Sequence, residues 1–310
     1  MTAIVEVAAH LPPDRLALED LADRLDLTER QIRLFRRFHG LSEVCLDLDG
    51  TLLDLLVAAT DGLESLRGNE SRVRYVVYAR GMPAAVPYPN NPLHEMCAKF
   101  GLDHAMAFTV THQACATGLL AVDVAGRLLA GEADPEALAL VVSGEKTFTP
   151  DARLVQETAI FGEGSAAVLV SAAGPRDRLL AYTTTTRGDF DGRLSIDPTL
   201  AARFQNEYHG LLAEVLLAAV ERAGLALDDI AVLLPHNVNS VSWRRVCKQI
   251  GFPLERVVLD NVAVTGHSFA ADPFLNYRTA HDQGRLRPGE RYLVGAAGLG
   301  ATFSAMVFEH

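Results

Sequence analysis

The chain has 310 residues, of which 49% are hydrophobic and 22% are charged. This balance is typical of an ordinary globular protein with one large or two medium domains. The net charge of −11, with no long basic run, argues against nucleic acid as a partner. The N-terminus lacks the pattern of a signal peptide, and no run approaches the ~18 apolar residues of a membrane span. We therefore expect a cytoplasmic protein without a membrane partner.

The four cysteines are scattered along the chain as Cys45, Cys97, Cys115 and Cys247. They form no CxxC pair and no Cys/His ligand spacing, so the sequence predicts neither a zinc site nor a disulfide framework. We expect all four thiols to be reduced and no metal to be bound.

The first half of the chain alternates strands and helices. The ranges that predict strands are 4–7, 74–80, 105–111 and 137–144, and the range 161–170 predicts a glycine turn that leads into a further strand. The ranges that predict helices are 18–25, 28–35, 52–63, 93–102 and 118–130. Thr28 and Gln31 have the form of a capping box. The nearly continuous apolar run 137–142 is typical of a strand buried on both faces. Glu145 and Lys146 follow this strand as a possible pair at the edge of a site, and a structural role is the favoured interpretation.

Residues 47–51, Asp-Leu-Asp-Gly-Thr, match the nucleophile loop of haloacid-dehalogenase-type phosphatases. That loop needs a buried strand ending on its first aspartate, and the apolar stretch before Asp47 is short and interrupted. We predict instead that Asp47 and Asp49 lie in the first turn of the helix that follows, where the helix dipole favours acidic side chains.

The second half repeats the alternation after a polar, threonine-rich segment, 177–197, which we expect to cross between the halves. The predicted elements are a helix over 199–224, a strand over 230–235, a helix that contains Trp243 and ends at Gly251, a short strand over 257–259, a helix over 273–284 and two strands over 291–298 and 301–308. Two similar α/β halves, 1–174 and 175–310, predict layered helices and sheets with a site between them.

One cysteine occupies a position suited to chemistry. Cys115 lies between the strand 105–111 and the helix that runs from Gly118, and hence at a strand-to-helix turn. Unpaired backbone N–H groups and the positive end of the helix dipole favour a thiolate there. A thiolate in this position is a nucleophile for an acyl group. The alternative is a buried structural thiol.

Five short motifs surround this cysteine in chain order. They are Ala-Cys-Ala-Thr-Gly at 114–118, Phe-Gly-Glu-Gly-Ser-Ala-Ala at 161–167, Pro-His-Asn-Val-Asn at 235–239, Gly-His-Ser-Phe-Ala-Ala at 266–271 and Gly-Leu-Gly-Ala-Thr at 298–302. Together they resemble the thiolase superfamily, and within it the ketoacyl-ACP synthase III branch, over nearly the whole chain. The resemblance implies a five-layered αβαβα fold and a homodimer. It also implies a cysteine that accepts an acyl group from an acyl-CoA or acyl-carrier-protein thioester, with no resident cofactor.

The chain departs from this branch at one position. The condensing enzymes carry a histidine and an asparagine opposite the cysteine. His236 matches the first, but His267 stands where the asparagine is expected, and Asp272 follows five residues later. This pattern resembles the subgroup of synthase III homologues that tailor natural products by acyl transfer to a hydroxyl or amino group with a Cys/Ser-His-Asp triad.

The two reactions make different demands on these side chains. Acyl transfer to oxygen or nitrogen needs a general base oriented by a carboxylate, which His267 and Asp272 can supply. Decarboxylative carbon–carbon bond formation needs two neutral donors on the malonyl thioester oxygen, which His236 and His267 can supply. We predict acyl transfer, with condensation as the alternative and a non-catalytic subunit of a heterodimeric synthase as a third reading. Asp272, directly before Pro273, is also an ordinary helix N-cap residue.

The resemblance assigns the remaining roles. It places the oxyanion hole at the backbone N–H groups of Cys115 and Gly300, where a glycine turn lets the backbone approach a ligand. A basic cluster of Arg33, Arg36 and Arg37, and a second formed by Trp243, Arg244 and Arg245, are candidate contacts for a CoA phosphate or an acidic carrier protein. The expected substrate-binding residues are Asn239, Trp243, Arg36 and Arg37.

Overall fold

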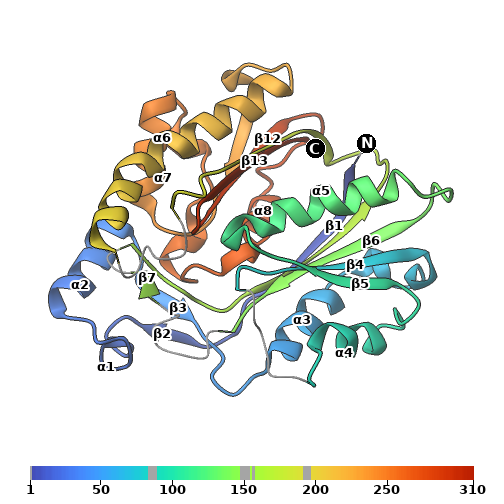
Figure 1. Cartoon of the computed structure of the whole chain (residues 1–310), viewed down its shortest axis with the longest axis horizontal. Coiled ribbons are helices and arrows are strands. Elements are labelled where there is room, and N and C mark those ends of the chain that lie inside the picture. Colours follow the sequence, from blue (N-terminus) through green and yellow to red (C-terminus); the bar gives the residue numbers. More distant parts are fainter. Residues whose placement is uncertain (1, 83–88, 147–153, 156–157, 191–196) are drawn as a thin grey trace.

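Figure 1 shows the computed structural model, which describes residues 2–82, 89–146, 154–155, 158–190 and 197–310. Within these residues the largest sheet has nine strands in the order β11-β12-β13-β10-β1-β9-β6-β4-β5. Its strands are β1 (Ala3–His10), β4 (Val73–Ala79), β5 (Met106–Val110), β6 (Leu138–Gly144), β9 (Ser165–Ser171), β10 (Arg178–Thr186), β11 (Ile230–Leu234), β12 (Arg291–Gly298) and β13 (Thr302–Glu309).

The sheet consists of two parts that meet at one point. In one part β4 runs parallel to β5 and β6, and β9 and β1 complete it with antiparallel pairing. In the other part β11 and β12 are parallel, and β13 and β10 follow antiparallel. The parts join where β1 pairs with β10, at Ala3 and Arg178. Every residue of β6 and of β9 is buried, as the continuous apolar run in β6 predicts.

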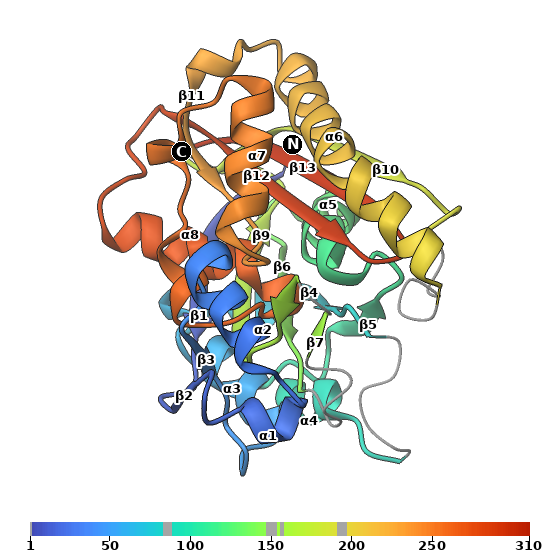
Figure 2. The same cartoon turned by 90° about the vertical axis from the view of Figure 1, so that its left-hand side faces the viewer.

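The helices form three layers around the two parts of the sheet (Figures 1 and 2). Helices α3 (Leu52–Asp61) and α4 (Pro92–Lys99) cover the outer face of β4, β6 and β9. Helices α5 (Thr117–Leu129) and α8 (Asp272–Asp282) share one core with strands of both parts, and so lie between them. Helices α6 (Pro198–Arg222) and α7 (Ser240–Ile250) cover the remaining face. This arrangement confirms the predicted α/β fold of five layers.

A small excursion near the N-terminus has its own core. Strand β2 (Arg15–Ala17) pairs with β3 (Glu43–Cys45), and between them lie α1 (Ala22–Leu25), α2 (Glu29–Leu34) and a π-helical turn, Phe35–His39. Thr28 and Gln31 form the predicted capping box at the start of α2. A short hairpin of β7 (Leu154–Val155) and β8 (Ala159–Ile160) lies further along the chain.

Two predicted connections take a different form in the structure. Residues 178–186 form strand β10 rather than a polar crossing. The β-branched threonines favour a strand, and the hydroxyls of Thr184 and Thr186 lie 2.9 and 3.0 Å from those of Ser304 and Thr302 on β13. Residues 191–196 of the same segment lie outside the described residues. The predicted strand 257–259 is reduced to one bridge between Val257 and Leu233.

The acidic motif at 47–51 also differs from its prediction. Helix α3 begins at Leu52 with Thr51 as its N-cap, so Asp47 and Asp49 precede the helix. The carboxylate of Asp47 instead accepts hydrogen bonds from the backbone N–H groups of Asp49 (3.2 Å) and Gly50 (2.7 Å). Asp47 thereby closes a local turn. The division of the chain at 174/175 stays a prediction.

None of the helices in the described ranges is both long and apolar enough to cross a membrane.

Candidate active site

Cys115 lies in a 3₁₀ turn, Ala114–Ala116, that leads directly into α5. The cysteine thus lies immediately before the helix. His112 and Ala114, near the cysteine, have φ angles of 73° and 45°. Residues other than glycine rarely adopt positive φ, and here these angles redirect the backbone after β5. The Cys115 side chain is buried with 6% exposure. The sulfur therefore sits at the N-terminal end of a buried helix, as the strand-to-helix pattern predicts.

The structure brings Cys115, His267 and Asp272 together across the two halves of the chain. The Nε2 atom of His267 lies 2.9 Å from the Sγ atom of Cys115. The Nδ1 atom of the same ring forms a short hydrogen bond with Oδ2 of Asp272. All three side chains are buried. The geometry is that of a nucleophile, a base and a carboxylate that orients the base.

Asp272 is held by backbone groups as well as by His267. Its Oδ1 accepts from the N–H of Ser268 at 2.8 Å, and its Oδ2 accepts from the N–H of Asn237 at 2.5 Å. Asp272 is the first residue of α8, and the N-cap position belongs to Ala271. The carboxylate therefore does not cap its own helix, and the backbone hydrogen bonds hold it so that Oδ2 meets His267.

The charged neighbours of His267 together affect its pKa more strongly than its burial does. Burial would lower the pKa of His267, but the negative charges of Cys115 and Asp272 and the hydrogen bonds to them raise this pKa to about 10. His267 is therefore protonated beside the sulfur at neutral pH.

An aromatic stack forms the wall of this site. The ring of Phe161 lies 5.0 Å from that of His267, and Phe269 stacks on Phe161 at 4.2 Å with an interplanar angle of 10°. Phe269 has φ of +52°, a left-handed conformation that costs a non-glycine residue free energy. Cys115, Phe161 and Phe269 form a separate buried cluster against which Met82 packs. The sulfur and the imidazole are thus bordered by apolar side chains.

His236 follows strand β11 and is completely buried. Its ring lies 5.9 Å from that of His267, and its Nε2 atom lies 2.8 Å from the hydroxyl of Tyr208. Burial, together with the charge of His267, lowers the pKa of His236 to about 3. His236 is therefore neutral. Sequence reasoning missed Tyr208, because an aromatic residue at an apolar position of a long helix is usually part of a core.

Two predicted substrate-binding residues have structural contacts instead. Trp243 has 0% exposure, and its indole N–H donates to the carbonyl oxygen of His236 at 2.9 Å. The Asn239 side chain accepts from the N–H of Ser242 at 2.7 Å, which caps α7, and donates to the Thr158 carbonyl at 3.1 Å. Both residues are buried and support the segment that carries His236. Their contact with a substrate stays a prediction.

The predicted basic residues lie on the surface. Arg36 and Arg37 belong to the π-helical turn, where Arg36 pairs with Glu19 at 2.6 Å and the neighbouring Phe38 is 61% exposed. This turn packs on the start of α7, because the Ser240 hydroxyl donates to the His39 carbonyl at 2.9 Å. The arginines are accessible on the side of the molecule where α7 begins.

Glu145 is a buried acid beside the site. Its oxygens accept hydrogen bonds from the backbone N–H groups of Gly81 and, at 3.0 Å, Met82. Burial raises the pKa of Glu145 to about 7, against the lowering effect of these bonds and of the charges of Arg80 and His267. The next residue, Lys146, forms a buried ion pair with Glu163 at 2.9 Å. Glu145 thus has structural hydrogen bonds and also an electrostatic contact with His267, which fits the alternative of a residue at the edge of the site.

The closing turn between β12 and β13 lies against the nucleophile turn. A Cβ atom on Gly298 would overlap the carbonyl oxygen of Gln113, so the two backbones are in close contact. Gly300 lies in the same turn with φ of +125°. The oxyanion-hole role of Gly300 stays a prediction.

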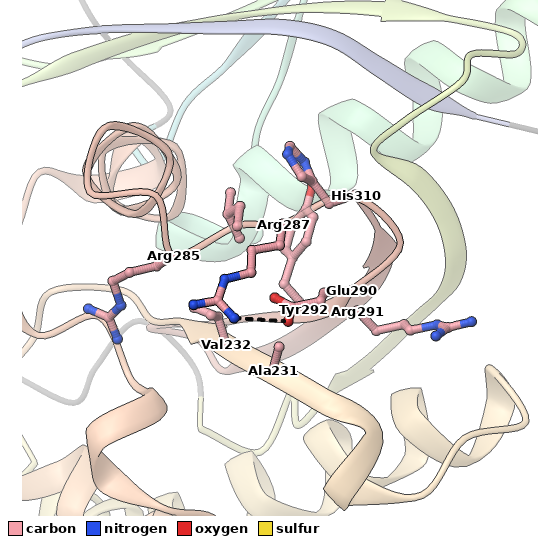
Figure 3. A pocket seen from close by; sticks show the side chains of 9 residues that line it. Ala231, Val232, Arg285, Arg287, Glu290, Arg291, Tyr292 and His310 are labelled. Carbon is pink, nitrogen blue, oxygen red and sulfur yellow. Dashed lines mark ion pairs between the residues drawn. The ribbon is translucent and has the colours of Figure 1, made fainter.

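Two further features concern possible ligands. No group of three or more His, Cys, Asp or Glu side chains within the described ranges is arranged to hold a metal ion. A surface hollow at the β11 edge of the sheet contains none of the residues discussed above (Figure 3). Its lining includes Val232, Arg285, Arg287, Glu290, Tyr292 and His310.

Comparisons with known proteins agree with this fold. The family model described as 3-oxoacyl-(acyl-carrier-protein) synthase III C terminal matches residues 220–310. Beta-ketoacyl-(acyl-carrier-protein) synthase III of Paracoccus denitrificans (strain Pd 1222) is 28% identical over 333 residues, covering 98% of each chain. The crystal structure of 3-oxoacyl-(acyl-carrier-protein) synthase III from Aquifex aeolicus VF5 matches with a TM-score of 0.85 at 20% identity, covering 100% of each chain. The structure of ChlB3, an acyltransferase, matches with a TM-score of 0.85 at 19% identity, covering 99% of this chain and 97% of its own. The chain is therefore similar to beta-ketoacyl-(acyl-carrier-protein) synthase III over 98% of its length and shares the fold of the solved synthase III structures.

Proposed function

We propose that this protein is an acyltransferase that moves an acyl group from an acyl-CoA or acyl-carrier-protein thioester to a hydroxyl or amine acceptor through an acyl-Cys115 intermediate. The observation that carries this proposal is the buried hydrogen-bonded series from Cys115 through His267 to Asp272. The relatives are named beta-ketoacyl-(acyl-carrier-protein) synthase III, and these names support an acyl carrier protein as a partner of this chain.

The first half-reaction acylates the cysteine. Protonated His267 favours the thiolate of Cys115, and the sulfur attacks the thioester carbonyl carbon. The backbone N–H groups of Cys115 and Gly300 would stabilise the oxyanion. As the tetrahedral intermediate collapses, the bond to the donor sulfur breaks, and His267 gives its proton to the departing thiolate. The products are acyl-Cys115, a free donor thiol and a neutral His267.

The second half-reaction uses His267 as a base. Acylation removes the negative charge from the sulfur, which is one of the influences that raise the pKa of His267. The neutral imidazole keeps its proton on Nδ1, facing Asp272, so Nε2 accepts the proton of the attacking hydroxyl or amine. The new C–O or C–N bond forms as the C–S bond breaks, which restores the thiolate beside a protonated His267.

Decarboxylative condensation is the alternative, and the synthase III names of the relatives favour it. That reaction needs both histidines as neutral donors to one malonyl thioester oxygen. Here the hydrogen bond to Tyr208 engages Nε2 of His236, and His267 is paired with Asp272. These contacts support acyl transfer over condensation.

The donor would approach from the surface near the start of α7. Arg36 and Arg37 on the π-helical turn, and Arg244 and Arg245 on α7, are exposed cations in an acidic chain. Such cations suit the phosphates of CoA or an acidic carrier protein. A homodimer, as the resemblance implies, is also part of the proposal.

The test separates the two half-reactions by intact-mass measurement. Incubation with acyl-CoA or acyl-carrier protein is expected to add one acyl group to the wild type and none to Cys115→Ala. Asp272→Asn is expected to form the adduct and to slow acyl release to an alcohol or amine on the order of 10²–10⁴-fold, because the base loses its orienting carboxylate.

Other outcomes would favour the alternatives. Release of carbon dioxide from a malonyl donor, with a new carbon–carbon bond in the product, would establish condensation. Absence of an adduct with every donor would support a non-catalytic subunit. Acyl release by Asp272→Asn at the wild-type rate would remove Asp272 from the site.

A further inference from the structure

Helix α6 contributes a polar group to the site that no motif predicts. The Tyr208 hydroxyl lies 2.8 Å from Nε2 of His236, whose ring is 5.9 Å from that of His267. Burial and the negative charge of Cys115 both raise the pKa of Tyr208, so the phenol stays neutral and lies within electrostatic reach of the nucleophile. Tyr208 therefore belongs to the surroundings of the triad.

Aromatic packing fixes the orientation of the Tyr208 ring and so the place of its hydroxyl. The Tyr208 ring packs edge-on against Phe204 at 5.5 Å and against Phe303 at 5.7 Å. His236 and His267 are buried, whereas Tyr208 keeps partial exposure. The tyrosine thus connects the buried histidines with the solvent-facing side of the site.

The hydroxyl has capacity for one more hydrogen bond. If Tyr208 donates to His236, its oxygen can still accept; if Nε2–H of His236 donates instead, the phenolic hydrogen is free. Within the described ranges, the bond to His236 is the one hydrogen bond recorded for this hydroxyl. In both cases a ligand can bind the Tyr208 oxygen without displacing His236.

We propose that Tyr208, supported by His236, is the acceptor-binding residue of the site. This rests on the proposed acyl transfer and extends it to the acceptor's chemistry. While His267 removes the proton from the nucleophilic group, Tyr208 binds a second polar group of the same molecule. The Tyr208 oxygen lies one hydrogen bond beyond His236, whose ring is 5.9 Å from that of His267, so an acceptor with two polar groups on a short carbon chain can place one group at each residue. The acceptor class is thus a short-chain diol or an amino alcohol.

The test compares Tyr208→Phe with the wild type in each half-reaction. The phenylalanine keeps the ring packing, so the rate of Cys115 acylation by acyl-CoA is expected to stay within about twofold, which also shows that the variant is folded. For 1,2-propanediol or 2-aminoethanol as acceptor, kcat/KM of transfer is expected to fall about 10- to 100-fold, since one hydrogen bond to the acceptor is lost. For 1-propanol or ethylamine, which lack the second group, the variant is expected to equal the wild type.

A matched control uses the same substitution elsewhere. Tyr75→Phe removes a hydroxyl that bonds to Glu132 near the other end of α5, and it is expected to change neither half-reaction. Two results would overturn the assignment of Tyr208 while leaving acyl transfer intact. One is an equal loss of kcat/KM for acceptors with and without a second polar group, and the other is an equal loss in the rate of Cys115 acylation. A wild type that forms no adduct would overturn acyl transfer and this acceptor site with it.

Discussion

At the scale of single residues, Glu145 joins a neighbouring segment to the nucleophile turn. Its carboxylate holds the N–H groups of Gly81 and Met82. A Cβ atom on Gly81 would lie 3.4 Å from the carbonyl carbon of Ala114 and 3.5 Å from the Phe269 ring, so this segment packs directly beside Cys115. Glu145 therefore helps to position the apolar wall that contains Met82 and Phe269.

Burial of Glu145 makes stability depend on pH. The carboxyl pKa is 4.5 when unperturbed and about 7 in the folded protein. Between these values the folded state keeps a proton that the unfolded state releases, so the free energy of unfolding falls by about 3 kcal/mol as pH rises through this window. In Glu145→Gln we expect the free energy of unfolding to lose this dependence on pH. Urea unfolding at pH 5 and pH 8 measures the difference, and Glu136→Gln, a substitution at an exposed site, is the control. Parallel pH curves for wild type and Glu145→Gln would contradict the assignment.

At the scale of elements, the contact between the end of β12 and the nucleophile turn decides whether the site assembles. Gly298 is the last residue of β12, and an added Cβ atom would overlap the Gln113 carbonyl and lie 2.9 Å from the Ala114 side chain. Because the obstacle is backbone, Gly298→Ala is expected to separate the two turns. We expect a loss of about 1–3 kcal/mol in stability and slower acylation of Cys115, measured by thermal unfolding and by adduct formation.

The matched control is Gly210→Ala in the middle of α6. An added Cβ atom there meets no atom within 4 Å, and alanine favours a helix over glycine by roughly 0.5–1 kcal/mol. This variant is expected to unfold at a slightly higher temperature and to acylate Cys115 normally. If Gly298→Ala acylates Cys115 as fast as Gly210→Ala does, the close contact at Gly298 has no role in assembling the site.

At the scale of the whole molecule, Asp177 fastens segments that are far apart in the chain. Its buried carboxylate accepts hydrogen bonds from Tyr277 of α8 (2.8 Å), Tyr292 of β12 (2.9 Å) and the C-terminal residue His310 (2.7 Å). Tyr292 and His310 also line the surface hollow at this edge of the sheet (Figure 3). The start of β10 is thus tied to the middle helix layer and to the end of the chain.

Removing this charge is expected to weaken the fold without touching the triad. Asp177→Asn replaces one acceptor oxygen by an amide group that faces other donors, which costs about 1–3 kcal/mol. The melting temperature is expected to fall by several degrees, while the folded variant acylates Cys115 at the wild-type rate at 25 °C. An unchanged melting temperature would show that the cluster contributes little to stability.

The roles that the sequence left open or assigned differently share a physical cause. Asn239 and Trp243 follow a motif histidine, and the motif alone does not tell a ligand contact from a buried support. In the fold Trp243 donates to the carbonyl of His236, and Asn239 caps α7. The threonines of 178–186 predict a polar loop when the sequence is taken alone, but in the fold these residues pair with β13 as a strand. In each case a partner distant in the chain determines the role.

The sequence by itself determined the order of strands and helices, the buried strand β6 and the position of Cys115 at a strand-to-helix turn. Hydrophobic periodicity, capping and turn chemistry act over a few neighbouring residues, and a single chain displays them directly. The resemblance of its motifs also predicted His267 and Asp272 as partners of Cys115, but only the tertiary structure showed that these side chains meet at the sulfur. His267 is 152 residues away from Cys115 in the chain, and Tyr208 reaches the site from a helix in another layer. Contacts between layers depend on how whole elements pack, which no local pattern specifies.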